Sequence, residues 1–582
     1  MALSRDPQWL ALRLVQLAVA VVLVLALFVA LVVPFHATDA LVYGQASRAI
    51  AEHGGFLVDG VAYPAYSRPL FYVTQGWLWW LFGWQEWIGR LESLAFFGLL
   101  LWSLFRLARD RALPPLAPWL TLLVLLACPD AVVQAFAGQT DTVVAAVLAF
   151  LAVVLWRWTP SSRTAIVVGI AALAAVLAKA TALPALAGLA AACFIGDRDG
   201  LRDRLRFGLA PLVAGVVVGL IYGAVMARHF GLALDEFLGG VAGTPTAPTD
   251  TTASVTHAAG TLPVPTAAEG IPDRVWNGIS DFFGSNRDSI LLRGEWLGPY
   301  LRLTVLYALV FAIARVVGAS HRIGVAIAWV LGLAGYVLGP VLLTGGELAF
   351  DDSAGSIAGS ILLLVPLAAA AWCPVEQQPS RAWCGRLLLM AIPPLLAWGV
   401  FGILGDTRTL SPAWPALFVL CGIVLAAGVA GLATRAAWAA AAAVVVLLGL
   451  AALDFRNFDG LGARPDGSIN SLRALRELTP GTWLHPNEAR IAADPQLGGE
   501  VEALRVALAP GARLASNDGR MIYYALDRAD IGPAPVDCAE LGDAGALVLL
   551  LNLPEPFDPT GFACLQPVAG EAGSYGAWRV TR

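Results

Sequence analysis

The chain has 582 residues, of which 58% are hydrophobic and 14% are charged. Soluble domains usually carry about 25% charged residues, so this composition excludes an ordinary soluble protein. The formal net charge of −5 says little about partners, because membrane proteins segregate charge by side. We expect a membrane lipid environment and no nucleic-acid partner.

Apolar segments near 20 residues recur from residue 12 to about residue 454, which predicts a polytopic α-helical membrane protein. The first segment is longer than the apolar core of a signal peptide and has no cleavage site after it, so we expect it to remain as a span. Thirteen spans are predicted, at 12–34, 88–105, 116–136, 141–156, 164–178, 182–196, 208–227, 299–317, 323–344, 357–373, 387–404, 413–432 and 436–454.

Arginines in the short loops predict the orientation, since cytoplasmic loops are rich in basic residues. Those that fall on one side are Arg106, Arg109, Arg111, Arg157, Arg163, Arg198, Arg202, Arg204, Arg206, Arg315, Arg322, Arg381 and Arg386. This side is predicted to be cytoplasmic, with the N-terminus inside and the C-terminus outside. The long loops 35–87 and 229–298 and the C-terminal segment then lie on the outer side.

The first outer loop opens with a predicted helix that follows His36, is capped by Thr38 and stops at the pair Gly54-Gly55. Asp39 and Tyr43 share one face of it, four residues apart. The helix dipole favours an ionised Asp39 at this N-terminus, where its carboxylate could accept a proton from a hydroxyl. A helix-capping aspartate is the alternative.

Further along the same loop, tryptophans recur at three- and four-residue spacing, at Trp77, Trp80, Trp84 and Trp87. This stripe is typical of a helix at a membrane interface. Arg68 precedes it and could contact a phosphate, or could be an ordinary surface arginine.

Asp141 opens the span 141–156, and Lys179, the only lysine of the chain, closes the span 164–178. Thr181 and Pro184 break the apolar run just after the lysine, so Lys179 is predicted to lie at a turn between two short helices. A cation there is tolerable near an interface or an anionic partner. Lys179 could bind a lipid phosphate, or could extend its amine to the headgroup layer.

From about residue 457 the composition changes, and short apolar runs at 546–553 and 576–580 alternate with a helix-like stretch at 498–509. This pattern predicts a small extracytoplasmic α/β domain over 457–582, after a membrane domain over 1–456. Cys538 and Cys564 are the only cysteine pair in the outer domain, which makes a disulfide plausible.

The order of these features resembles the GT-C membrane glycosyltransferases, in particular the bacterial branch of protein O-mannosyltransferases and lipid A aminoarabinose transferases. The residues that carry the resemblance are Asp39, Tyr43, Ala46, Gly54, Pro69-Leu70-Phe71-Tyr72, Gly83, Arg90-Leu91, Asp141 and Leu177-Ala178-Lys179. They cover about the first 200 residues; the remainder matches in layout.

The resemblance implies an inverting transferase in the bacterial cytoplasmic membrane. Its donor would be a sugar on a polyprenyl phosphate, and its acceptor an envelope lipid, polysaccharide or protein. Asp39 would be the base, Asp141 would orient the acceptor or the catalytic loop, and Lys179 and Arg68 would bind the phosphate. The site would be lined by Tyr43, His36 and Tyr66. The resemblance implies that no cofactor is required. A divalent metal is compatible with it, but no spacing of ligand residues in the sequence demands a metal.

Two other classes remain open from the sequence. A lipid-linked glycan transporter or flippase would place polar residues at a midplane site, but no inverted repeat is visible and the acids gather at one face. A non-catalytic envelope assembly protein would use Asp39 as a cap and its outer domain to bind partners.

Overall fold

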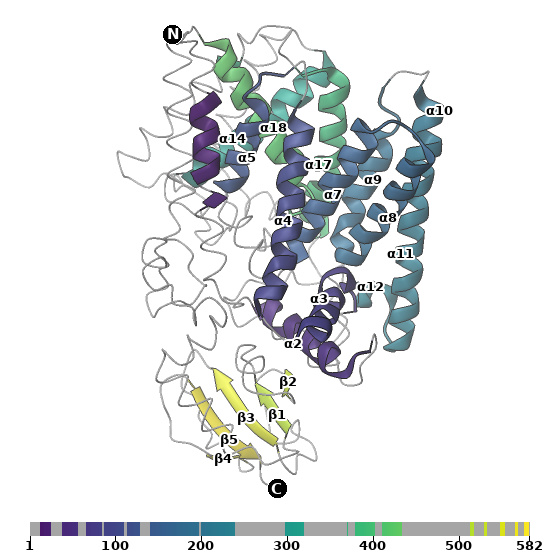
Figure 1. Cartoon of the computed structure of the whole chain (residues 1–582), viewed down its shortest axis with the longest axis vertical. Coiled ribbons are helices and arrows are strands. Elements are labelled where there is room, and N and C mark those ends of the chain that lie inside the picture. Colours follow the sequence, from purple (N-terminus) through teal and green to yellow (C-terminus); the bar gives the residue numbers. More distant parts are fainter. Residues whose placement is uncertain are drawn as a thin grey trace.

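The computed structural model describes residues 12–21, 23–24, 38–55, 66–83, 86–109, 113–127, 140–196, 200–238, 297–318, 369–370, 379–401 and 410–432. It also describes the strand residues 513–516, 529–531, 547–552, 565–567 and 575–580. The helices form one bundle, and the strands form a separate sheet beyond one end of it (Figure 1).

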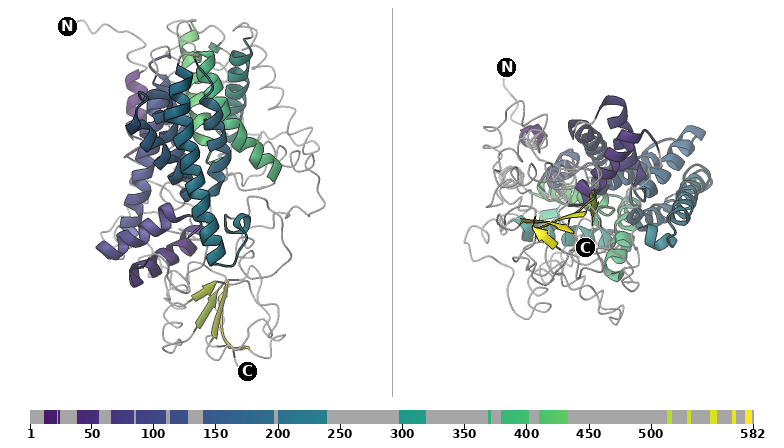
Figure 2. Two further views of the ribbon diagram at one scale, coloured as in Figure 1. Left: turned by 90° about the vertical axis from the view of Figure 1, so that its right-hand side faces the viewer. Right: turned by 90° about the horizontal axis from the view of Figure 1, so that it is seen from below.

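Six helices follow one another through the first half of the bundle, and Figure 2 shows them packed along nearly parallel axes. They are α4 (Glu86–Ala108), α5 (Ala117–Leu126), α7 (Thr140–Arg157), α8 (Ser162–Ala178), α9 (Leu183–Ala192) and α11 (Ala210–His229). Helix α7 packs against α4 and α8, and α8 packs against α11. The charges of α7 fit the helix dipole, because Asp141 lies in its first turn and Arg157 in its last turn.

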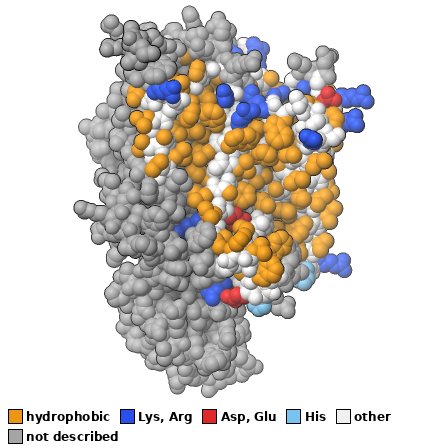
Figure 3. Space-filling view, viewed as in Figure 1, with side chains coloured by type: hydrophobic (Ala, Val, Ile, Leu, Met, Phe, Trp, Pro, Cys, Tyr) orange, Lys and Arg blue, Asp and Glu red, His pale blue; other side chains and the backbone are white. Residues whose placement is uncertain are grey.

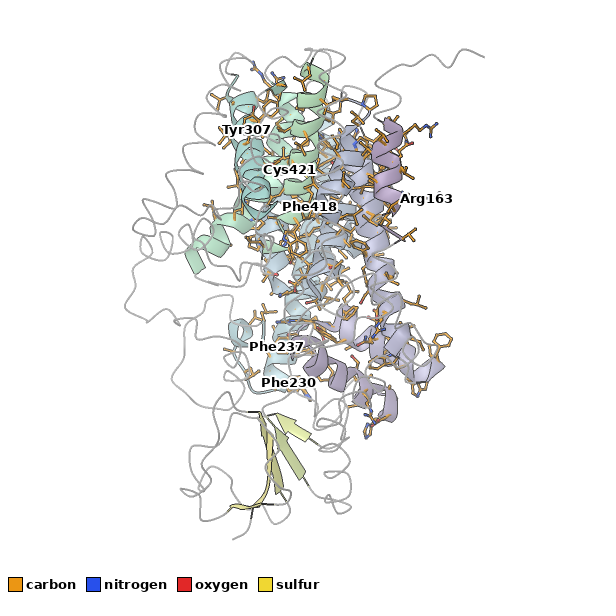
Figure 4. The ribbon with its side chains drawn as sticks, turned by 90° about the vertical axis from the view of Figure 1, so that its left-hand side faces the viewer. Arg163, Phe230, Phe237, Tyr307, Phe418 and Cys421 are labelled. Carbon is orange, nitrogen blue, oxygen red and sulfur yellow. The ribbon has the colours of Figure 1, made fainter. Side chains whose placement is uncertain are left out.

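Three later helices complete the described bundle: α14 (Leu297–Val317), α17 (Arg381–Phe401) and α18 (Trp414–Gly431). Helix α18 packs against α5, and its side chains are buried through Val429. It is apolar on every side, as expected for a helix surrounded by other helices. Figure 4 labels Phe418 and Cys421 of this helix together with Tyr307 of α14, and all three are buried.

One end of the bundle, called here the arginine end, is held together by guanidinium groups that donate to backbone carbonyls. Arg157 donates to the carbonyl of Leu107 at the end of α4 (3.0 Å), and Arg315 donates to Pro379 before α17 (3.1 Å). Helix C-termini leave their last carbonyls without intrahelical partners, and arginines satisfy such groups well. The end where α7 begins and α8 ends is called the site end.

The face between the two ends is apolar. Figure 3 shows hydrophobic side chains over most of its described part, with many of the basic side chains along the upper edge. Among the described residues, four helices are long and apolar enough to cross a membrane: Ile88–Ala108, Thr140–Arg157, Leu201–His229 and Trp414–Gly431. Shorter apolar helices lie beside them. The chain is therefore a helical membrane protein.

Described helices overlap the predicted spans 88–105, 141–156, 164–178, 182–196, 208–227, 299–317, 387–404 and 413–432. Of the span 116–136 only 116–127 is described, and of 12–34 only 12–21 and 23–24. The spans 323–344 and 436–454 lie outside the described residues, and only residues 369–370 of 357–373 are described. The total of thirteen therefore stays a prediction, as does the division at residue 456.

At the site end, α2 (Thr38–His53) and α3 (Pro69–Phe82) pack against each other outside the main bundle. Ser47 Oγ donates to the carbonyl of Tyr72 (2.8 Å). A Cβ at Gly76 would come within 2.8 Å of Ile50 Cβ, so the two helices approach closely because residue 76 is glycine. The predicted end of α2 at Gly54 is confirmed, and its φ of 67° is one that glycine adopts readily.

The spacing predicted that the tryptophan stripe lies on one helix. In the structure the stripe is divided between two helices. Helix α3 ends at Phe82, Gly83 has a φ of 83°, and Trp87 belongs to α4. The positive φ of Gly83 breaks the helical periodicity between the two halves of the stripe. Trp77 and Trp80 are nevertheless exposed on α3.

The C-terminal strands form one mixed sheet in the order β2-β1-β3-β5-β4, from β1 (Arg513–Ser516), β2 (Ala529–Ile531), β3 (Leu547–Asn552), β4 (Leu565–Pro567) and β5 (Tyr575–Val580). Strand β1 is parallel to β2 and β3, and β5 is antiparallel to β3 and β4. Strands β3 and β5 coincide with the predicted apolar runs. The helix-like stretch 498–509 lies outside the described residues, so an α/β domain stays a prediction.

Candidate functional site

Asp141 and Lys179, two predicted site residues, meet at the site end of the bundle. Lys179 Nζ donates to Asp141 Oδ1 over 2.9 Å, and the exposed fractions of the two side chains are 14% and 6%. Two charges this far from solvent are stable only when each has a close partner. The sequence predicted that both residues lie at the same membrane boundary, but it did not predict that they form an ion pair.

The backbone around Lys179 explains how the ammonium reaches this position. Helix α8 ends at Ala178, Lys179 itself is extended with a φ of −171°, and a 3₁₀ turn (η2, Ala180–Ala182) leads into α9. Pro184 lies in the first turn of α9, where its missing N–H costs no hydrogen bond. The predicted turn between two short helices is confirmed, and it directs the only lysine toward the start of α7.

Ser411 is a third member of the cluster that sequence reasoning missed. It lies just before α18 and is fully buried, and its Oγ donates to the same Asp141 Oδ1 over 3.1 Å. The hydroxyl thus holds the carboxylate in place although Ser411 and Asp141 are 270 residues apart in the sequence. The sequence signal was slight: a serine followed by proline at the start of a predicted span.

This cluster can position a cation for an incoming anion. An ammonium has three N–H donors, and Asp141 accepts one of them. A phosphate oxygen at the partly exposed side of Lys179 could accept another. Because Asp141 and its hydrogen bonds fix the ammonium beforehand, little reorganisation would be needed when negative charge develops.

The predicted base lies on α2, at the same end of the bundle. Asp39 and Tyr43 belong to the first turns of α2, whose backbone the structure describes while the side chains of both residues lie outside its description. His36 lies outside the described residues altogether. The structure therefore brings the helix of Asp39 to the site end, and the contacts of Asp39 stay a prediction.

Two other predicted residues lie at the turn into α3. Arg68 is half-buried immediately before the first residue of α3, and its carbonyl accepts hydrogen bonds from the backbone N–H groups of Tyr72 and Phe71.

Tyr66 is fully buried in an apolar cluster with Ile50 and Phe237. Its ring stacks on Phe230 with centroids 5.5 Å apart, and its carbonyl accepts a hydrogen bond from the Tyr222 hydroxyl. Figure 4 shows Phe230 and Phe237 of this cluster at the end of the bundle that faces the sheet. Tyr66 thus packs α2 and α3 onto α11 and lies in a core distinct from the Asp141 cluster.

No group of three or more His, Cys, Asp or Glu side chains suited to hold a metal is found within the described ranges. His36 and the side chain of Asp39 are not among them, so metal dependence stays untested. Cys538 and Cys564 also lie outside the described residues, and their pairing stays a prediction.

No family model and no curated protein matches the chain. A solved structure does: ArnT from Cupriavidus metallidurans bound to undecaprenyl phosphate is 16% identical, with a TM-score of 0.52 over 97% of each chain. The apo structure of the same protein matches with a TM-score of 0.43 at the same identity and coverage. ArnT is a lipid A aminoarabinose transferase of the GT-C type. The resemblance predicted from the sequence is therefore confirmed at the level of the fold: the chain has the fold of ArnT.

Proposed function

We propose that the chain is an inverting glycosyltransferase that moves a sugar from a polyprenyl phosphate to an envelope acceptor. The observation that carries this proposal is the buried Lys179–Asp141–Ser411 cluster, which lies toward the same end of an ArnT-like bundle as the helix of Asp39. A lysine held by a carboxylate at a membrane boundary suits a reaction whose leaving group is a lipid phosphate.

The arrangement of charge supports a reaction at the outer face of the bacterial cytoplasmic membrane. The arginine end has the basic loops expected on the cytoplasmic side. The site end, with α2 and α3, then faces outward, as does the C-terminal sheet. On this reading the N-terminus is cytoplasmic and the C-terminal domain is extracytoplasmic.

Each residue has a stated part in the proposed reaction. The Asp39 carboxylate takes the proton of the acceptor hydroxyl while that oxygen attacks the anomeric carbon from the face opposite the phosphate. The bond between the anomeric carbon and the phosphate oxygen breaks, and its electron pair leaves on the polyprenyl phosphate. Lys179 stabilises the charge that develops there, with Arg68 as a second candidate, and Asp141 holds Lys179 in position.

The donor class follows from the fold relative, whose solved structure contains undecaprenyl phosphate. A lipid phosphate is a good leaving group, so the proposal requires no nucleotide or other cofactor. The acceptor is an envelope lipid, polysaccharide or protein.

The test compares envelope glycans and polyprenyl-phosphate sugars by mass spectrometry in a deletion strain. The strain carries the wild type, Asp39→Asn or the control Glu52→Gln. Glu52 is an exposed acid on the same helix that pairs with Arg48 at 2.9 Å, so it controls for loss of one α2 carboxylate. We expect Asp39→Asn, at equal abundance, to lose a glycan mass and accumulate a lipid-linked monosaccharide.

If Asp39→Asn behaves like the wild type, Asp39 is not the base. If vesicles containing the protein then move a lipid-linked sugar without altering it, the protein is a transporter and the proposal is wrong.

A further inference from the structure

A pocket lies at the arginine end, away from the Asp141 cluster. It is partly open to its surroundings and lies between the ends of α7 and α9, the start of α17 and the short helix α10 (Leu201–Arg204). Helix α7 runs 16 residues from Asp141 to Arg157, so the two sites are about 24 Å apart. We call it the arginine pocket; its lining includes Trp156, Trp158, Cys193, Arg204, Phe207 and Arg386.

Two guanidinium groups are fixed at this pocket by the backbone. Arg204 Nε donates to the carbonyl of Cys193 and Arg386 Nη2 donates to that of Ile195, each over 2.9 Å. The two groups also lie close to each other, beside the turn after α9: a Cβ at Gly196 would lie 3.0 Å from Arg204 Nη1 and from Arg386 Nη2. Fixed, neighbouring guanidinium groups match the oxygen geometry of a phosphate, whereas an arginine on a mobile loop must first be ordered.

The local helix geometry shapes this pocket. Residues Leu205–Leu209 form a π-helical turn (η4) between α10 and α11, and such turns are frequent at functional sites. Gly208 within the turn lines the pocket, where a Cβ would lie 3.2 Å from Leu155 Cδ2. The turn thus holds Arg204 and Phe207 on one wall while glycine keeps the wall close to α7.

The walls also supply an indole donor and an apolar exit. The Nε1–H of Trp156 is buried and has no acceptor among the described residues. Trp158, also on the wall, is 39% exposed, and Ile166 and Ile170 are exposed one and two turns further along α8. Asp203 is the one described acid on the wall and lies at its exposed side. A ligand with an anionic head and apolar chains fits this sequence of surfaces.

We propose that the arginine pocket binds the phosphate headgroup of an anionic phospholipid from the leaflet at the arginine end. The phosphodiester oxygens accept hydrogen bonds from Arg204 and Arg386, and the acyl chains lie along the exposed apolar side chains of α8. Basic pockets between membrane helices on the cytoplasmic side commonly bind such headgroups. A free anion would use the same guanidinium groups but would gain nothing from the apolar exit.

The test uses the purified full-length protein, delipidated in detergent, with phosphatidylglycerol, phosphatidylcholine or inorganic phosphate added. We expect phosphatidylglycerol to raise the unfolding midpoint and phosphatidylcholine to leave it unchanged. The double variant Arg204→Gln/Arg386→Gln should bind phosphatidylglycerol at least tenfold more weakly. Arg202→Gln is the matched control, since Arg202 is exposed on the same short helix and does not line the pocket. Equal binding by the double variant and the wild type would overturn the proposal, as would stabilisation by inorganic phosphate alone.

A second measurement needs no variant and covers the case in which the double variant does not fold. The wild type is irradiated with a photoactivatable phosphatidylglycerol, and the labelled peptides are mapped by mass spectrometry. Labelling is expected in the segments 154–164, 192–193 and 203–208 and next to Arg386, which supply the residues of the pocket walls. Labelling confined to other segments would show that the lipid binds elsewhere.

Discussion

The Lys179 ammonium lies 2.9 Å from the Asp141 carboxylate although 38 residues separate them, because α7 and α8 are antiparallel neighbours. Asp141 stands at the start of α7 and Lys179 just past the end of α8, so the hairpin of the two helices brings both charges to one level. The pair is therefore both a structural tie between the helices and the cation that the proposed reaction needs.

Removing either member should destabilise the protein more than removing both. Lys179→Met or Asp141→Asn leaves a buried charge without its partner, which typically costs about 3–5 kcal/mol, whereas the double variant buries no unpaired charge. Thermal unfolding of the four proteins in detergent measures this cycle. Additive losses in the double variant would mean that the two charges do not stabilise each other.

Activity should follow a different rule from stability. The double variant Lys179→Met/Asp141→Asn recovers stability but has no cation for the leaving phosphate, so its kcat/KM is expected to fall about 100-fold or more. Transfer from a synthetic polyprenyl-phosphate sugar, assayed at equal folded protein, checks this. A double variant with wild-type turnover would remove Lys179 from the mechanism.

Ser411→Ala should weaken the site by loss of one hydrogen bond to a carboxylate. Such bonds contribute about 1.5–3 kcal/mol, and the ammonium would still hold Asp141, so we expect a moderate stability loss and a several-fold loss of turnover. Ser161→Ala is the matched control: Ser161 caps α8 at the arginine end through the Thr164 N–H (3.2 Å). It should lose about 1 kcal/mol of stability with unchanged turnover, which separates a site effect from a folding effect.

The sequence predicted the elements of the site better than their contacts. The break at Thr181 and Pro184 was enough to place Lys179 at a turn, and the apolar run after Asp141 was enough to place that acid at a helix start. Ser411 could not be found in this way. Its partner is 270 residues distant, and a buried serine before a helix looks the same in sequence as an exposed capping serine.

Periodicity alone also misread the tryptophan stripe. Trp77 and Trp87 have helical spacing, but Gly83 adopts a positive φ and places them on different helices, which hydrophobic patterns cannot reveal. Tyr66, which the resemblance places among the residues that line the site, packs on Phe230 of the segment after α11, and its part in the site stays a prediction. Which side chains pack against each other in this way depends on the lengths of the helices and the directions in which they pack, and the sequence pattern does not give these.

Trp80 is expected to contact lipid directly. It is 56% exposed on α3, whereas its neighbour Trp79 is 1% exposed, and amphipathic indole rings concentrate at membrane interfaces. Benzoylphenylalanine placed at position 80 should crosslink to phospholipid in native membranes. The same probe at position 52, an exposed polar position on α2, should give several-fold less lipid adduct. Equal yields at the two positions would place α3 away from the bilayer surface.

The contact between α9 and α17 predicts a strong effect at Gly188. A Cβ there would overlap the carbonyl oxygen of Leu389 and lie 3.2 Å from Pro393 Cγ, so even Gly188→Ala forces the two helices apart. Overpacking of this kind typically costs about 1–3 kcal/mol and more where backbone must move, so we expect a large fall in the unfolding midpoint. Gly98→Ala is the matched control, because a Cβ at this exposed position in the middle of α4 meets nothing within 4 Å and alanine favours the helix by about 1 kcal/mol. Thermal unfolding of both variants in the same detergent decides the point. If Gly188→Ala has the same unfolding midpoint as the wild type, the distance between α9 and α17 at Gly188 is larger than in this structure.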